Sequence, residues 1–133
     1  MARTNIPLST FNANDDLTDP AGTAADETNG HVVAPVASWP GVTLEDIVLR
    51  VVLDTAGDAA TVTVKAGANP PALEAGQGDL AVSCADNAAT WIGPFRSGRF
   101  QQVATDADAE GFWLDIDDET GVTITAFALP RVA

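Results

Sequence analysis

The chain has 133 residues, of which 46% are hydrophobic, and its formal net charge is -13 at pH 7. This length suits one domain with a real core, and the apolar content excludes a disordered chain. Because the charge repels phosphate backbones and anionic lipids, we expect no nucleic-acid partner and no membrane partner. The start of the chain lacks the long apolar core of a signal peptide, so we expect synthesis in the cytoplasm.

Residues 1–30 are polar and contain prolines, with isolated apolar side chains at Ile6, Leu8 and Phe11. We predict an extended N-terminal arm with one short strand near 6–10. The apolar side chains indicate that the arm lies against a surface, either of its own domain or of a neighbour, whereas a loose terminus is the alternative. On the first interpretation, these three side chains are partner-contact candidates that matter more for binding than for folding.

The remainder, residues 31–133, shows short apolar–polar alternations separated by turn residues. This pattern is typical of an all-β domain, and we predict an antiparallel β-sandwich or jelly-roll-like barrel of about eight strands. The sequence shows no amphipathic helix and no internal repeat. The strands are expected near 32–36, 47–53, 61–65, 80–85, 90–95, 100–103, 112–117 and 122–129.

The centre of this fold is expected at 47–67, a segment that predicts two long strands joined by a polar turn. Alternate apolar side chains from Ile47 to Leu53 share one face of the first strand, and valines also lie between them, so we expect both faces to be covered. We interpret the segment as a hairpin. A second hairpin is predicted near the end of the chain, where the turn 118–121 joins the last two strands.

Two further features suit contacts with a neighbour. The loop 67–79 contains Pro70 and Pro71, which favour an extended and shaped backbone, and long ordered loops tend to carry contacts. Arg96 and Arg99 form the only local cluster of positive charge in the sequence. In so acidic a protein, we expect them to pair with carboxylates, either across a subunit contact or within the monomer.

Apolar side chains at outward positions of two strands predict self-association. Trp113 falls on the polar face of its strand, and Phe127 and Leu129 fall on the outward face of the last strand. An outward tryptophan is often an interface anchor, although a loop, the arm or another subunit can also cover such positions. We predict an oligomer, and a homotrimer in particular, when the protein is assembled with its partner.

Residues with catalytic chemistry are few and scattered. His31 is the only histidine, and the only cysteine, Cys84, cannot form an internal disulfide and is expected to be a small buried side chain. Asp115 and Asp117 share one face of a strand, a spacing that suits inverting glycoside hydrolysis only where a cleft and a raised pKa accompany it. We therefore assign no catalytic residue and no cofactor.

The same two carboxylates, with Asp118 and Glu119, make a calcium site conceivable, because Ca²⁺ binds about six to eight oxygen ligands. The spacing does not match an EF-hand loop. A solvated acidic turn is the preferred interpretation, and we assign no metal ligand.

Four runs of loop and strand residues carry a resemblance. They are DETNGHVV at 26–33, TVKAGANPPA at 63–72, GDLAV at 78–82 and WIGPF at 91–95. Together they resemble small structural proteins encoded among the head genes of tailed phages of actinobacteria, which are similar to capsid decoration, or cement, proteins. The resemblance covers most of the chain from about residue 26 onward.

This resemblance implies a non-catalytic virion protein that is made in the host cytoplasm and binds the major capsid protein on the capsid exterior. Such proteins often act as homotrimers at the three-fold positions of an HK97-type lattice, where they stabilise the shell against internal DNA pressure. A strong negative charge is tolerable there, because the protein lies outside the shell and away from the DNA.

Other classes of function remain open. A different virion part, such as a tail or head-completion protein, would use the same motifs. A carbohydrate-binding β-sandwich would use Trp39, Trp91 or Trp113 as stacking platforms, although the scarcity of aromatic residues and the absence of tyrosine count against it. A small hydrolase that uses Asp115 and Asp117 ranks last.

Overall fold

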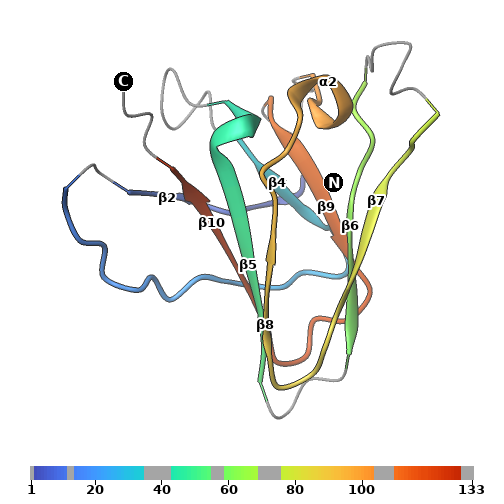
Figure 1. Ribbon diagram of the computed structural model, residues 1–133. Helices are drawn as coiled ribbons and strands as arrows, with labels where there is room; N and C mark the ends of the chain where they lie inside the picture. Colours follow the sequence, from blue (N-terminus) through green and yellow to red (C-terminus); the bar gives the residue numbers. More distant parts are fainter. Residues whose placement is uncertain are drawn as a thin grey trace.

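The computed structural model describes residues 2–11, 14–34, 43–54, 59–68, 76–103 and 110–129. These residues form two packed β-sheets with almost no helix, so the chain is an all-β sandwich, as predicted (Figure 1). No helix among them is long and apolar enough to cross a membrane. The strands are β1 (Thr4–Asn5), β2 (Leu8–Thr10), β3 (Thr23–Ala24), β4 (His31–Val33), β5 (Ile47–Leu53), β6 (Ala60–Val64), β7 (Leu80–Cys84), β8 (Ala89–Ile92), β9 (Phe112–Ile116) and β10 (Val122–Ala128), and the helical turns are η1 (Leu44–Asp46) and α2 (Ser97–Phe100).

The chain passes several times from one sheet to the other. One sheet, here called the β9 sheet, has the order β1-β4-β9-β6-β7. The other, called the β10 sheet, has the order β2-β10-β5-β8, and β3 also pairs with β10. The described pairings among strands β4 to β10 are all antiparallel, and so is the pairing of β3 with β10. The pairings of β1 with β4 and of β2 with β10 are parallel. The N-terminal segment therefore contributes strands to both sheets.

The core lies between the sheets and is filled by the inward residues of each strand. In β5 the inward side chains from Ile47 to Leu53 are at most 1% exposed, while the outward residues between them are only half-buried. The predicted covering of both faces of this strand is therefore incomplete on the outward side. The inward residues of β9, such as Leu114, meet them from the opposite sheet as parts of one core cluster. Fully burying one such side chain contributes roughly 1.5–3 kcal/mol.

Both predicted hairpins are wrong. The strands β5 and β6 belong to different sheets, so the segment 47–67 crosses the sandwich, and β9 and β10 are likewise separated. The true partner of β5 is β10, in a register that places Ile47 opposite Ala128 and Leu53 opposite Val122. A polar turn suits a crossing between sheets as well as a hairpin, because both need only a reversal of direction. The choice between them follows from which strands bury each other's inward faces.

One end of the sandwich is closed by α2 and η1. The predicted strand at 100–103 is instead the end of α2 and an isolated bridge between Gln102 and Gly111. Three buried aromatic rings pack beneath it: Phe95 lies 4.7 Å from Phe112 and 5.8 Å, edge-on, from Phe100. This aromatic cluster ties the connection after β8 to β9 and so links the two sheets at this end.

Candidate partner-contact surfaces

The N-terminal segment lies along its own domain. Its backbone pairs with β4, where the N–H of Thr4 donates to the carbonyl of Gly30 at 2.9 Å and that of Ile6 to the carbonyl of Val32 at 3.0 Å. Ile6 is 1% exposed and belongs to the core, and Leu8 packs against that core from the side. The structure thus places Ile6 where it serves folding, in contrast to the expectation that it matters mainly for binding.

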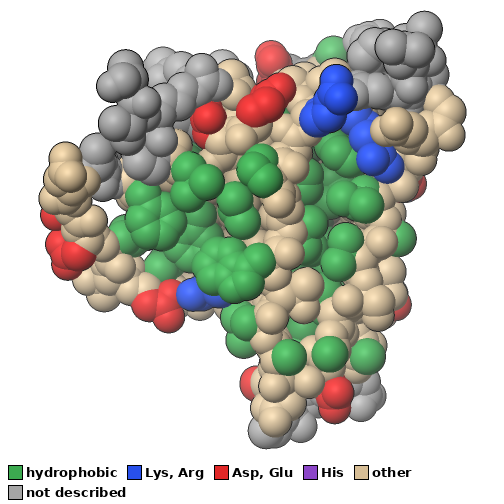
Figure 2. All heavy atoms as spheres, in the orientation of Figure 1, with side chains coloured by type: hydrophobic (Ala, Val, Ile, Leu, Met, Phe, Trp, Pro, Cys, Tyr) green, Lys and Arg blue, Asp and Glu red, His purple; other side chains and the backbone are tan. Residues whose placement is uncertain are grey.

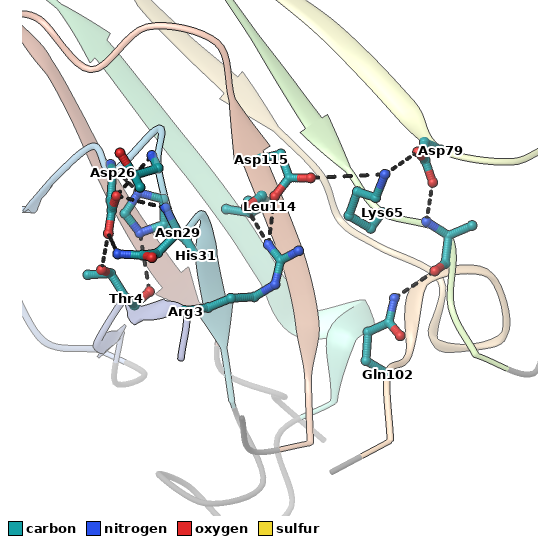
Figure 3. Close-up of polar contacts among 12 residues, drawn as sticks. Arg3, Thr4, Asp26, Asn29, His31, Lys65, Asp79, Gln102, Leu114 and Asp115 are labelled. Carbon is teal, nitrogen blue, oxygen red and sulfur yellow. Dashed lines mark hydrogen bonds and ion pairs between the residues drawn. The ribbon is translucent and has the colours of Figure 1, made fainter. Parts of the chain in front are cut away.

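A buried histidine fastens this segment (Figure 3). His31 is fully buried, and its Nε2 atom accepts a hydrogen bond from the backbone N–H of Asp26 at 3.0 Å. Because Nε2 accepts, Nδ1 carries the proton and donates to the carbonyl of Thr4 at 3.2 Å. Burial lowers the pKa of His31, since the charged ring would lose its hydration. The ring is therefore neutral, and it links Thr4 near the start of the N-terminal segment to Asp26 near its end.

Asp26 makes the turn beside His31 rigid. Its carboxylate accepts hydrogen bonds from the hydroxyl of Thr4 at 2.6 Å, from the backbone and side chain of Asn29 at 3.0 and 3.1 Å, and from the backbone of Thr28 at 3.1 Å. The bond from Thr4 is the largest of several that lower the pKa of Asp26 to about 2. These contacts make a structural corner that joins β1 to the start of β4.

The outer surface of the β9 sheet is polar and internally paired (Figure 3). Arg3 contacts Asp115 at 2.7 Å, and Lys65 contacts Asp79 at 2.8 Å and Asp115 at 4.0 Å. The guanidinium of Arg3 also lies 4.7 Å from the ring centre of Trp113, which is half-buried. The N-terminal segment therefore covers Trp113. Of the two interpretations left open by the sequence, this is the one in which the chain itself covers the ring, rather than the interface anchor. We call this surface the polar face.

The outer surface of the β10 sheet carries an exposed apolar patch (Figure 2). Trp91 is 57% exposed and Leu129 is 42% exposed, and among the described residues the only other exposed large apolar side chain is Val103, at 52%. The ring of Phe127 lies 5.6 Å from that of Trp91 and 5.5 Å from that of Phe11. Phe127 itself is only 3% exposed, so this predicted contact residue lies beneath its neighbours. The side chains of Phe11, Trp91, Phe127 and Leu129, with the half-buried Val48 opposite Phe127 in the register, form what we call the apolar face.

Arg50 lies in the middle of the apolar face. In the register it faces Trp91, and its guanidinium lies 5.8 Å from that ring and 5.3 Å from the ring of Phe127. It is held by an ion pair with Asp19 at 2.6 Å and by a bond to the carbonyl of Pro20 at 3.3 Å. Arg50 therefore stiffens the aromatic rings by stacking and anchors the loop that precedes β3.

The two predicted arginines line a pocket at the end of the sandwich. Its volume is about 410 Å³, and its lining residues come from α2, from the start of β7 and from the segment between β8 and α2. Arg99 stacks on Phe100 at 4.8 Å and donates through Nε to the carbonyl of Gly78 at 3.4 Å. We call it the arginine pocket; its lining residues are Gln77, Leu80, Gly93, Pro94, Phe95, Arg96, Arg99 and Phe100.

The predicted contact residues are divided among these places. Pro70 and Pro71 lie outside the described residues. Trp113 belongs to the polar face, while the tryptophan exposed on the apolar face is Trp91, which the sequence had suggested only as a sugar-stacking platform. A signal was present, since Trp91 precedes the inward Ile92 and so must point outward.

The carboxylates considered for catalysis or calcium are used in local contacts. Asp117 accepts the backbone N–H of Thr61 at 2.8 Å, Asp118 that of Thr120 at 3.0 Å, and Glu119 that of Glu27 at 3.1 Å. In the described part of the chain, no group of three or more His, Cys, Asp or Glu side chains is placed to hold a metal ion.

Cys84 is fully buried, as predicted, in the core cluster. Burial raises the pKa of its thiol, which keeps the group protonated and unreactive.

Comparisons with known proteins add no relative to this picture. A scan against protein-family models, a search of curated proteins and a search of solved structures each returned no match to the chain.

Proposed function

We propose that this protein is a virion structural protein that binds the outer surface of a phage capsid and stabilises the shell without catalysis. The observation that carries the proposal is the apolar face, on which Trp91 is 57% exposed. Contiguous exposed apolar patches on soluble domains commonly mark protein–protein contacts, and aromatic and arginine side chains dominate their binding energy. The resemblance of four sequence motifs to phage head proteins supplies the partner, the major capsid protein.

The construction of the apolar face supports this role. Trp91 stands on β8 and Phe127 on β10, and both strands pair with β5 between them, which carries Arg50 and Val48. The ring of Phe127 is held between those of Phe11 and Trp91, and Arg50 stacks against two of them. Side chains that are already ordered lose little conformational entropy on binding, so contact with a rigid shell is favoured.

The charge of the chain suits the same role. A formal net charge of -13 opposes random aggregation through the exposed apolar face, because like-charged copies repel one another over most of their surface. Many modest contacts repeated over a lattice, and copies linked as the proposed homotrimer, then sum to firm attachment.

Co-sedimentation with DNA-filled or empty shells tests the proposal. Trp91→Ala is expected to weaken shell binding by on the order of tenfold or more, because it removes the most exposed side chain of the apolar face. Val103→Ala is the matched control, since Val103 is 52% exposed but lies outside the apolar face. An intact protein that never associates with shells contradicts the proposal, and equal binding by wild type and Trp91→Ala contradicts the assignment of the contact to this face.

A protein at another position in the virion would use the same surface, so the number of copies per particle distinguishes these roles. A decoration protein is present in many copies per particle, whereas a tail or head-completion protein is present in few.

A carbohydrate-binding module is the second candidate, because an exposed indole on a sheet is a stacking platform. The neighbours of Trp91 are a phenylalanine ring and an arginine already paired with Asp19, which offers little polar recognition of sugar hydroxyls. Binding to a glycan array that is lost in Trp91→Ala would favour this candidate.

A further inference from the structure

The arginine pocket concentrates positive charge in a strongly acidic protein. Five basic side chains lie in the described part of the chain. Two of them, Arg96 and Arg99, line this one pocket. Figure 2 shows Lys/Arg side chains grouped next to hydrophobic side chains at the upper right of this view. The pocket therefore suits a ligand that carries carboxylates next to an apolar side chain.

The pocket is also preorganised for such a ligand, because its side chains are already held in place. Arg99 is held by its stacking on Phe100 and by its bond to the carbonyl of Gly78, and the floor is the fixed aromatic cluster around Phe95. Guanidinium groups bind carboxylates through paired N–H donors, and a guanidinium that is already positioned loses less entropy when it does so.

One segment of the chain has the complementary chemistry. The loop between β2 and β3 contains Asp15, Asp16 and Leu17, two exposed carboxylates followed by a half-buried aliphatic side chain. Within the described residues, no ion pair involves Asp15 or Asp16. This loop, drawn in blue, projects from the side of the sandwich away from α2 and β7 (Figure 1). We call residues 14–19 the acidic loop.

We propose that the arginine pocket of one copy binds the acidic loop of a second copy. Loop and pocket lie on different sides of the molecule, so one copy cannot satisfy its own pocket. The contact is head-to-tail, and such heterologous contacts generate closed rings when the rotation between copies closes. The proposed homotrimer is one such ring, although the contact itself does not depend on what the apolar face binds.

Charge reversal in two places tests this pairing by sedimentation velocity over a range of concentrations. The variants are Arg96→Glu/Arg99→Glu and Asp15→Arg/Asp16→Arg. Each alone is expected to weaken self-association by about tenfold or more, because like charges then meet at the contact. Their equimolar mixture is expected to associate, since each variant offers what the other lacks, and the fourfold variant is expected to self-associate as wild type does.

A control separates this contact from the effect of net charge. Glu27→Arg/Asp86→Arg changes the charge by the same amount as Asp15→Arg/Asp16→Arg at exposed positions away from the acidic loop, and it is expected to leave the proposed contact intact. Circular dichroism and melting temperature confirm that every variant is folded.

Three results overturn the proposal. The first is a wild type that remains monomeric at every concentration and on the shell. The second is a pocket variant that associates as wild type does, or a mixture of the two variants that fails to associate. The third is a pocket variant that loses shell binding with unchanged self-association, which assigns the pocket to the capsid. Loss of self-association with retained shell binding supports the proposal and leaves the proposed function standing.

Discussion

The polar face and the apolar face are built from the same kind of alternating strand, yet they end in opposite surfaces. On the β9 sheet, outward charges pair with one another and Arg3 covers Trp113. On the β10 sheet, an outward position of the edge strand β8 holds Trp91, which stays 57% exposed. The N-terminal segment makes the difference, because it lays Arg3 over Trp113, whereas on the other sheet its Phe11 ring packs on Phe127 and leaves Trp91 exposed. An outward tryptophan is thus a contact residue only where the rest of the chain leaves it open.

The largest expected effect comes from a substitution in the N-terminal segment, which distinguishes the two faces. Ile6→Ala removes a side chain that is 1% exposed in the core and is expected to lower the free energy of unfolding by about 2–5 kcal/mol. Asn5→Ala is the neighbouring control at an exposed position, with an expected change within about 0.5 kcal/mol. Denaturant unfolding measures both. Equal stability of the two variants would show that the segment does not belong to the folded core.

The next effect compares the two tryptophans directly. Trp113→Ala is expected to lower the free energy of unfolding by about 1–3 kcal/mol, because it removes a half-buried ring that packs under Arg3, and to leave shell binding unchanged. Trp91→Ala is expected to show the reverse, with stability within about 1 kcal/mol of wild type and weakened shell binding. Melting temperature and co-sedimentation are measured on the same samples. A variant pair that changes both properties together would remove the distinction between the faces.

A smaller effect depends on pH and arises at the corner formed by His31 and Asp26. The pKa of His31 is lowered from its ordinary value of 6.5, so the unfolded chain binds a proton more readily than the folded one. The stability from this group is fully present above about pH 6.5 and is lost as the pH falls towards the folded pKa. Asp26, with a pKa of about 2 against an ordinary 3.8, adds a second loss at lower pH, between those two values.

Thermal melting between about pH 7.5 and about pH 5 measures the first loss, which lies above the titration of Asp26. In His31→Gln, the amide keeps one donor and one acceptor but does not titrate, so the melting temperature is expected to depend less on pH in this range. The same slope in wild type and variant would assign the pH dependence to other groups.

The smallest effect concerns the ion pairs of the polar face. Asp115→Asn removes the charge that Arg3 contacts at 2.7 Å, but the Asp115 side chain is 46% exposed. Arg3 also keeps its bond to the carbonyl of Leu114 at 3.0 Å. We expect a loss of about 1 kcal/mol or less, which shrinks further in high salt. Asp86→Asn, at an exposed turn between β7 and β8, is the control. A loss of several kcal/mol would mean that the polar face carries more of the stability than its exposure indicates.

Much of the local structure was predictable. The strand β5 begins and ends at Ile47 and Leu53, as the sequence indicated, and its inward side chains are those that the alternation selected. The burial of Cys84 followed from the same rule. The clustering of Arg96 and Arg99 was visible in the sequence, because the two residues lie close together along the chain.

The pairing of strands was not predictable in the same way. The hairpin expected at 47–67 failed because turn chemistry records only that the chain reverses, and the partner of β5 is β10, far along the sequence. The short helix α2 replaced an expected strand, since its apolar Phe100 packs on Phe95 rather than in a sheet.

The sequence by itself determined that this chain is all-β and which side of the long strands β5 and β9 faces the core, because period-two alternation is a property of neighbouring residues. Only the tertiary structure decided which strands pair, that His31 joins Thr4 to Asp26, and that Trp91 rather than Trp113 is exposed. These features depend on contacts between residues distant in the chain. Whether an outward side chain is covered is set by what folds over it, and no local pattern records that.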